Sequence, residues 1–179
     1  MIDHRLCFTM TYSNLHCRLG TLVNLTSILF ILLFVTVSFP DAIIRSPSVD
    51  VHAEVSKLNR FRKRLNGNDE VSLNLNISVD LSSVFNWKTK QLFVFVTAEY
   101  KTLQNSFNQV ILWDRTIHDR DSAKFEIYAK NKYLLIDQGC HLLGKEIQLV
   151  VNWYVMHKTG WMSRHNKSMS YFELPQVYI

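Results

Sequence analysis

Hydrophobic and polar residues follow two different patterns along this chain. Between residues 19 and 39 every position is uncharged, and most are leucine, isoleucine, valine or phenylalanine. Beyond residue 47, apolar residues instead recur at every second position over several segments. The continuous run predicts a membrane-spanning helix, whereas the two-residue period predicts strands with one buried face.

The uncharged segment has the length of a transmembrane signal anchor. Its 21 residues would form a helix of about 31 Å, which matches a hydrocarbon core of about 30 Å. Pro40 follows directly and cannot continue the helix. A cleaved signal peptide is the alternative, but its apolar region runs only about 7–15 residues and ends at small residues of the A-x-A type. The sequence therefore favours an uncleaved anchor.

Charges flanking the segment do not decide its orientation. Arg5 and Arg18 precede it, and Arg45 and Lys57 follow it, so the positive-inside count is nearly balanced. However, only 18 residues precede the segment and 140 follow it, and long domains translocate largely regardless of charge. We therefore expect a type II protein, with a cytosolic segment at 1–18, the anchor at 19–39 and a lumenal or extracellular domain at 40–179.

The domain after the anchor is predicted to be built from β-strands. Residues 71–79 alternate apolar and polar side chains throughout, residues 147–155 largely repeat the pattern, and residues 49–55 form a shorter version. Such alternation is typical of strands with one solvated face. Further strands are predicted at 91–100 and 110–113. Their continuous apolar character suggests that they are covered on both faces or contact another molecule. Short strands are predicted at 133–136 and 169–174. Antiparallel strands at this spacing predict a mainly β protein with a β-sandwich domain.

Composition and charge narrow the function classes. The chain is 47% apolar with five glycines and three prolines, which excludes disordered and collagen-like classes. Its net charge is +5, and the run Arg60–Arg64 holds four basic residues. In a chain inserted in a membrane, we interpret this run as a solvated loop between two strands that contacts lipid headgroups or an acidic partner. Nucleic acid is not an expected partner.

Catalytic and metal-binding motifs are not found in the sequence. The dipeptide Ser168-Met169 resembles the nucleophile position of signal-peptidase-type proteases, but no histidine or lysine follows it as a base. Cys140-His141 has no second ligand pair at a useful spacing. We therefore expect no catalytic residue, no metal and no cofactor.

Two sequons outside the anchor are candidates for N-glycosylation. Asn76 begins the first and falls on the polar face of a predicted strand, and Asn166 begins the second. We expect Asn166 to lie in a polar loop, which makes it the better acceptor.

Residues 80–114 read DLSSVFNWKTKQLFVFVTAEYKTLQNSFNQVILWD. This stretch resembles the signature of the signal peptidase complex subunit 3 family: D-L, F-x-W, K-Q-L-F, A-E-Y, N-Q-V and L-W-D at fixed spacings. Lys132, Tyr133, Asp137, Pro175 and Tyr178 match further family positions. The motif residues that the resemblance identifies as core or interface positions are Asp80, Phe85, Trp87, Lys90, Gln91, Phe93, Glu99, Tyr100, Asn108, Trp113 and Asp114.

The resemblance implies a non-catalytic subunit of the endoplasmic-reticulum signal peptidase. In the family, a type II membrane subunit holds the separate catalytic subunit with its lumenal β-sandwich, so the implied partners are that subunit, the other subunits of the complex and membrane lipid. The family's usual sequon is missing here, because Glu146-Ile147-Gln148 occupies its place. The alternative function is a single-pass β-sandwich binding or adhesion ectodomain.

Overall fold

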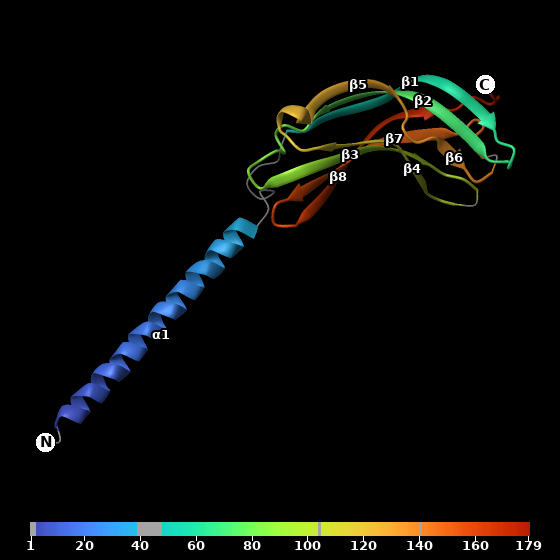
Figure 1. The fold of residues 1–179 in the computed structure, drawn as a ribbon. Coiled ribbons are helices and arrows are strands. Elements are labelled where there is room, and N and C mark those ends of the chain that lie inside the picture. Colours follow the sequence, from blue (N-terminus) through green and yellow to red (C-terminus); the bar gives the residue numbers. More distant parts are fainter. Residues whose placement is uncertain (1–2, 39–47, 104, 140) are drawn as a thin grey trace. The chain divides into compact units, whose positions relative to one another are not determined.

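The structure is a computed structural model that describes residues 3–38, 48–103, 105–139 and 141–179. The chain divides into two units, Met1–Ser46 and Pro47–Ile179, which are considered separately. The first unit contains one helix, α1 (Asp3–Ser38), and the second unit, here called the body, contains all the strands (Figure 1).

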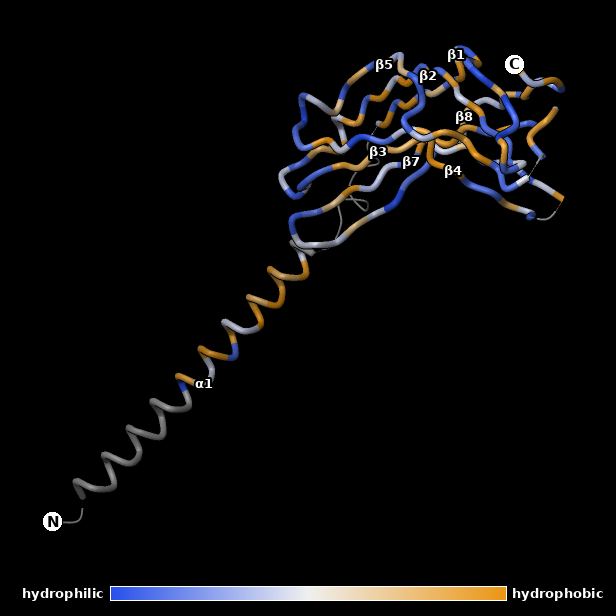
Figure 2. The backbone as a smooth tube through the Cα atoms, turned by 45° about the vertical axis from the view of Figure 1, so that its right-hand side comes forward, coloured by the Kyte–Doolittle hydropathy of each residue, from blue (hydrophilic) through white to orange (hydrophobic). Residues whose placement is uncertain are grey.

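Helix α1 is longer than the sequence pattern predicts, since it begins at Asp3 rather than at residue 19. The stretch that is long and apolar enough to cross a membrane is Arg18–Thr36, coloured mainly as hydrophobic in Figure 2. Within it, the hydroxyls of Thr26 and Ser27 donate hydrogen bonds to carbonyls of the preceding turn. These bonds satisfy the two hydroxyls inside the helix, as an apolar surrounding requires. Phe39 and Pro40, the predicted end of the anchor, lie outside the described residues.

The body consists of two four-stranded antiparallel sheets stacked as two layers (Figure 1). One sheet has the order β1-β2-β5, with β6 also pairing with β2, and the other has the order β4-β3-β7-β8. The prediction of a mainly β protein with an antiparallel sandwich is thus confirmed. The strands are β1 (Asp50–Lys63), β2 (Asp69–Asp80), β3 (Thr89–Tyr100), β4 (Asn108–Ile117), β5 (Lys124–Lys130), β6 (Leu135–Asp137), β7 (Glu146–His157) and β8 (Met162–Glu173), and a short 3-10 turn, η2 (Asp121–Ala123), precedes β5.

Alternating apolar side chains from both sheets form one core. Leu75 on β2 and Leu149 on β7 are both almost completely buried in it. The apolar positions of 71–79 are all buried, whereas Ser78 in the same strand is exposed. The two-residue period therefore identified the inward faces of β2 and β7 correctly.

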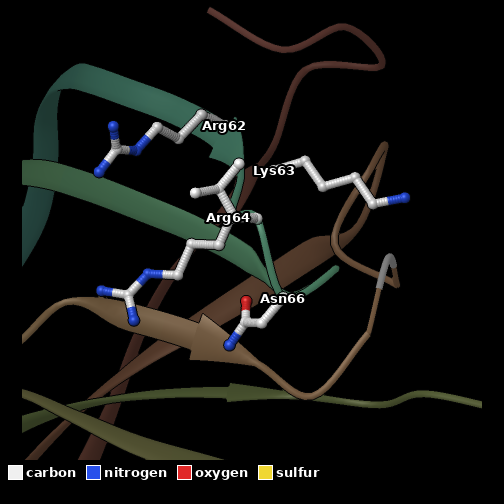
Figure 3. A pocket seen from close by; sticks show the side chains of 5 residues that line it. Arg62, Lys63, Arg64 and Asn66 are labelled. Carbon is white, nitrogen blue, oxygen red and sulfur yellow. The ribbon is translucent and has the colours of Figure 1, made fainter.

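The basic run Arg60–Arg64 was expected in a loop, but its first four residues belong to β1. β1 pairs with β2 up to Lys63 opposite Asp69, and only Arg64 lies in the turn. Arg62 and Arg64 form ion pairs with Glu70, which is almost fully buried, while Lys63 points to the other side of the hairpin (Figure 3). Two of the four basic charges are therefore paired within the hairpin.

The structure differs from the sequence-based expectations at two further strands, β8 and β5. Asn166 lies in β8 opposite Asn152 rather than in a loop, since β8 begins at Met162 and not near Met169. β5 was not predicted at all. Asn76 does lie on the predicted polar face of β2, where its side-chain amide donates a hydrogen bond to Glu54.

Replacing Glu70 by glutamine should destabilise the body in a pH-dependent way. The hydrogen bond from Arg64 and the nearby arginine charges lower the pKa of Glu70, against the opposing effect of burial. A lowered folded pKa gives stability that is complete above the unfolded pKa of about 4.3 and is lost as the pH falls through the folded value. We expect Glu70→Gln to cost about 1–2 kcal/mol at neutral pH. Urea unfolding of the full chain in mild detergent should show this difference shrinking in acid, and a difference independent of pH would contradict the assignment.

Candidate protein-interaction surface

The outer face of the β4-β3-β7-β8 sheet carries a cluster of aromatic side chains. β3 turns Leu92 and Val94 into the core, so the alternate residues Phe93 and Phe95 project from the outer face. Tyr154 of β7 lies opposite Phe93 in the register. The ring centroids of Phe93 and Phe95 are 5.4 Å apart, and that of Tyr154 lies 6.5 Å and 5.4 Å from them. The three rings thus pack into one apolar cluster, in which Phe95 is buried and Phe93 and Tyr154 are half-buried.

A buried polar network lies beside the three rings and fixes the neighbouring side chains. Asn152 donates a hydrogen bond of 3.1 Å to the hydroxyl of Thr97, and that hydroxyl donates one of 3.2 Å to the carbonyl of Val150. Arg164 of β8 donates to the Asn152 side-chain oxygen, and its guanidinium lies 5.9 Å from the Tyr154 ring centroid. Side chains held in this way lose little conformational entropy when a partner binds.

More exposed apolar residues extend this surface toward both edges of the sheet. Ile111 lies opposite Thr97 and is 42% exposed, and Tyr171 lies opposite Gln148 and is 60% exposed. Figure 1 shows no third layer over this face among the described strands. Aromatic residues are enriched in the core of protein–protein interfaces and contribute much of the binding energy there. We call Phe93, Phe95, Ile111, Tyr154 and Tyr171 the aromatic face.

Four of the motif residues belong to this sheet's outer side or its edge. Phe93 lies in the aromatic face itself, and Gln91 beside it donates a hydrogen bond to the sulfur of Met156. Glu99 accepts a hydrogen bond of 2.9 Å from Gln109. At the β4 edge, Asp114 pairs with Lys132 at 3.1 Å.

Four other motif residues stabilise the fold. Tyr100 is buried and donates a hydrogen bond of 2.9 Å to Asp137, which ties β3 to β6. Burial and this contact raise the pKa of Tyr100 far above its ordinary range, so the phenol stays protonated. Asn108 bonds to the carbonyl of Tyr100, Trp113 packs on Phe125 of the other sheet, and Phe85 packs against the core.

The remaining three motif residues lie where β2 ends and β3 begins. Asp80 accepts hydrogen bonds from Ser82 and pairs with Lys124 at 3.1 Å, and these contacts lower the pKa of Asp80. Trp87 and Lys90 are exposed. The motif therefore does not mark one site but three regions of the body.

Residues considered for chemistry are not brought together. Ser168 is exposed on the edge strand β8, opposite Val150, and has no hydrogen-bonded base among the described residues. Among the described residues, a serine–histidine hydrogen bond joins the half-buried Ser163 to the exposed His165, two positions apart in β8. The described part of the chain contains no cluster of three metal-ligating side chains. Cys140 lies outside the described residues.

Sequence reasoning missed most of the aromatic face. Phe95 belongs to a segment that the sequence indicated to be covered on both faces or in contact with another molecule. Its neighbours on the outer face, Tyr154, Thr97 and Asn152, were not identified as part of the same surface. The available signal was the pair of phenylalanines, Phe93 and Phe95, at successive outward positions of this strand. A strand with an ordinary solvated face would carry polar side chains there.

Comparison with known proteins shows strong similarity over most of the chain. The profile of a family described as "Signal peptidase subunit" matches residues 12–177. Proteins named "Signal peptidase complex subunit 3" match from Oryza sativa subsp. japonica, with 46% identity over 74% of this chain and 76% of the relative, and from Dictyostelium discoideum, with 34% identity over 75% and 78%. The Homo sapiens protein of that name is 33% identical over 71% of this chain and 72% of its own length.

Among solved structures, the sporulation control protein Spo0M from Bacillus subtilis matches with 9% identity and a TM-score of 0.26, over 70% of this chain and 49% of that chain. A likeness of this strength bears on neither the fold nor the function.

Proposed function

The chain belongs to the family of signal peptidase subunits, and from this membership we propose that it is the non-catalytic scaffold subunit of the endoplasmic-reticulum signal peptidase complex. In this role it binds the catalytic subunit and positions it for removal of signal peptides from secretory and membrane proteins. Its partners are the catalytic subunit, the other subunits of the complex and membrane lipid.

The aromatic face is the structural feature that supports a scaffold role. It offers Phe93, Tyr154 and Ile111 on one side of a rigid sheet, where aromatic anchors contribute most to the energetics of an interface. We propose this face as the contact for the catalytic subunit. Ser168 and His165 are both exposed on β8, where His165 contacts the hydroxyl of Ser163 and stacks on the ring of Trp153.

The proposed topology is type II in the endoplasmic-reticulum membrane. Residues 1–18 lie in the cytosol, residues 19–39 form the signal anchor and residues 40–179 form the lumenal domain. The span Arg18–Thr36 supports the anchor, and insertion of such a helix is effectively irreversible. In sealed microsomes, an epitope after Ile179 should be protected from protease and one before Met1 should be digested. The opposite protection pattern would refute the topology.

Rescue of cells depleted of this subunit tests the function. Depletion should leave secretory precursors with uncleaved signal sequences, and the wild-type chain should restore cleavage. Ser168→Ala and His165→Ala should restore it equally well, because neither side chain takes part in chemistry in a scaffold. Loss of a nucleophile or base would instead lower the rate by orders of magnitude. A severe cleavage defect from either variant in a normally assembled complex would refute the scaffold role.

A further inference from the structure

One end of the body gathers four separate segments of the chain. The hydroxyl of Ser83 donates a 2.6 Å hydrogen bond to the carbonyl of Ser48, the first described residue after α1. The backbone N–H of Leu81 donates to Ala123 at 3.0 Å. The backbone N–H of Lys158 donates to Lys88 at 2.8 Å. The β2–β3, β4–β5 and β7–β8 connections therefore meet at the end where the chain arrives from the helix; we call it the anchor end.

Two tryptophans project from the anchor end. Trp87 in the β2–β3 connection is 68% exposed, and Trp161 in the β7–β8 turn is 63% exposed. The Lys88 ammonium lies 5.2 Å from the centroid of the Trp87 ring. By contrast, Trp113 and Trp153 are buried in the body. Both exposed tryptophans thus lie on connections joined by a backbone hydrogen bond.

The covalent chain limits how far this end of the body can lie from the end of α1. Helix α1 ends at Ser38 and the described body resumes at Ser48, and ten residues span at most about 35 Å when fully extended. This limit holds for any relative placement of the helix and the body. The opposite end, at the β1–β2 turn, is separated from Asp50 by the whole of β1, whose 14 residues extend over about 45 Å.

We propose that Trp87 and Trp161 insert into the headgroup region of the bilayer that α1 spans, so that the anchor end of the body rests on the membrane. Tryptophan is enriched at this level of a bilayer because its ring is largely apolar and its N–H can stay hydrated. The inference rests on the membrane-spanning role proposed for α1. It adds a second, peripheral attachment that limits how far the body tilts away from the membrane.

The charges at the anchor end indicate which lipids are sufficient for insertion of the two tryptophans. Lys88 and Lys158 lie beside the tryptophans, but the β4–β5 connection carries Asp119 and Asp121 together with Arg120. These loop charges nearly balance, so attraction to anionic lipid contributes little. Insertion should therefore occur in bilayers of phosphatidylcholine alone, and adding phosphatidylserine should not change it.

Fluorescence quenching in vesicles tests the proposal. Residues 1–47 contain no tryptophan, so the emission of the full chain comes only from the body. The full chain is reconstituted into phosphatidylcholine vesicles that contain brominated phosphatidylcholine, a quencher buried in the bilayer. Wild type should be strongly quenched, and Trp87→Phe/Trp161→Phe should lose most of that quenching because the remaining tryptophans are buried. Equal quenching of the two proteins would overturn the proposal.

A tryptophan at the opposite end serves as the matched control. Leu65 in the β1–β2 turn is fully exposed, and Leu65→Trp in the double-phenylalanine background should show the emission of a hydrated tryptophan with little quenching. If Leu65→Trp were quenched as strongly as wild type, the proposed orientation of the body on the membrane would be wrong. If quenching of the wild-type chain required phosphatidylserine, insertion driven by the tryptophans would be refuted. Flotation of the same vesicles separates the two hypotheses: a chain that does not float refutes the anchor itself, whereas a chain that floats unquenched refutes only the inference.

Discussion

Replacing Phe93 by aspartate should weaken capture of the proposed catalytic partner while leaving most of the body folded. The ring lies on the outer face, stacked on Phe95 and Tyr154, and it lies outside the core cluster between the sheets. A carboxylate at this position would lose the aromatic contact and bury a charge in the interface. We expect a loss of affinity of at least about tenfold, which corresponds to about 1.4 kcal/mol. Co-purification in mild detergent with the partner held at fixed concentration measures it.

Two further variants separate loss of binding from loss of folding. Ile111→Asp changes a more exposed residue of the same face, so it should weaken capture with a smaller effect on thermal unfolding. Tyr128→Asp is the matched control, because Tyr128 is 61% exposed on the outer side of the other sheet, opposite Asn76. Capture should be unchanged in this control. Normal capture by both Phe93→Asp and Ile111→Asp would show that the aromatic face is not the interface.

Much of the sandwich could be predicted from local patterns because its central strands obey the two-residue period. In β2, Leu73, Leu75 and Ile77 face the core, and polar residues between them face away. β7 repeats this order with Ile147 and Leu149. Both strands have neighbours on each side, so one face is fully buried and selects apolar side chains strictly. The sequence pattern and the burial pattern therefore coincide.

The two-residue period failed to predict strands whose pairing contains register shifts or whose residues are exposed on both faces. β1 contains two register shifts, between Val55 and Lys57 and between Leu58 and Arg60. Each inserted residue reverses the alternation, so the inward residues Val55, Leu58 and Phe61 are three apart instead of two. β8 is an edge strand whose residues are mostly exposed, so it has no strict alternation to detect. Asn166 was misplaced in a loop for this reason.

The candidate site could be predicted only in part, since its members come from distant positions. The motif drew attention to Phe93 and Tyr100, which are seven residues apart in one strand but have different roles. Phe93 faces outward with Tyr154, whereas Tyr100 bonds to Asp137 in the interior. These partners are 61 and 37 residues away in sequence. A spacing pattern within one segment carries no information about such contacts; the pairing of β3 with β7 and the stacking of the two sheets create them.

Removing the side chain of Leu75 should have a large effect on the stability of the body. Leu75 is fully buried on the central strand β2, between Val55 of β1 and Ala129 of β5. Leu→Ala at such a site loses the transfer free energy of the side chain and leaves a cavity that the two layers cannot close. We expect Leu75→Ala to cost roughly 2–5 kcal/mol, and Leu149→Ala in the opposite layer should cost a similar amount.

Ser78 provides the matched comparison for this prediction, because it lies three residues from Leu75 in the same strand and points away from the core. Ser78→Ala should change stability by about 0.5 kcal/mol or less. Urea unfolding of the full chain in mild detergent, followed by tryptophan emission, reports on the body directly, since Trp113 and Trp153 are buried in its core and α1 contains no tryptophan. If Leu75→Ala and Ser78→Ala shifted the midpoint equally, the two faces of β2 would be equivalent and the one-sided core of the sandwich would be refuted.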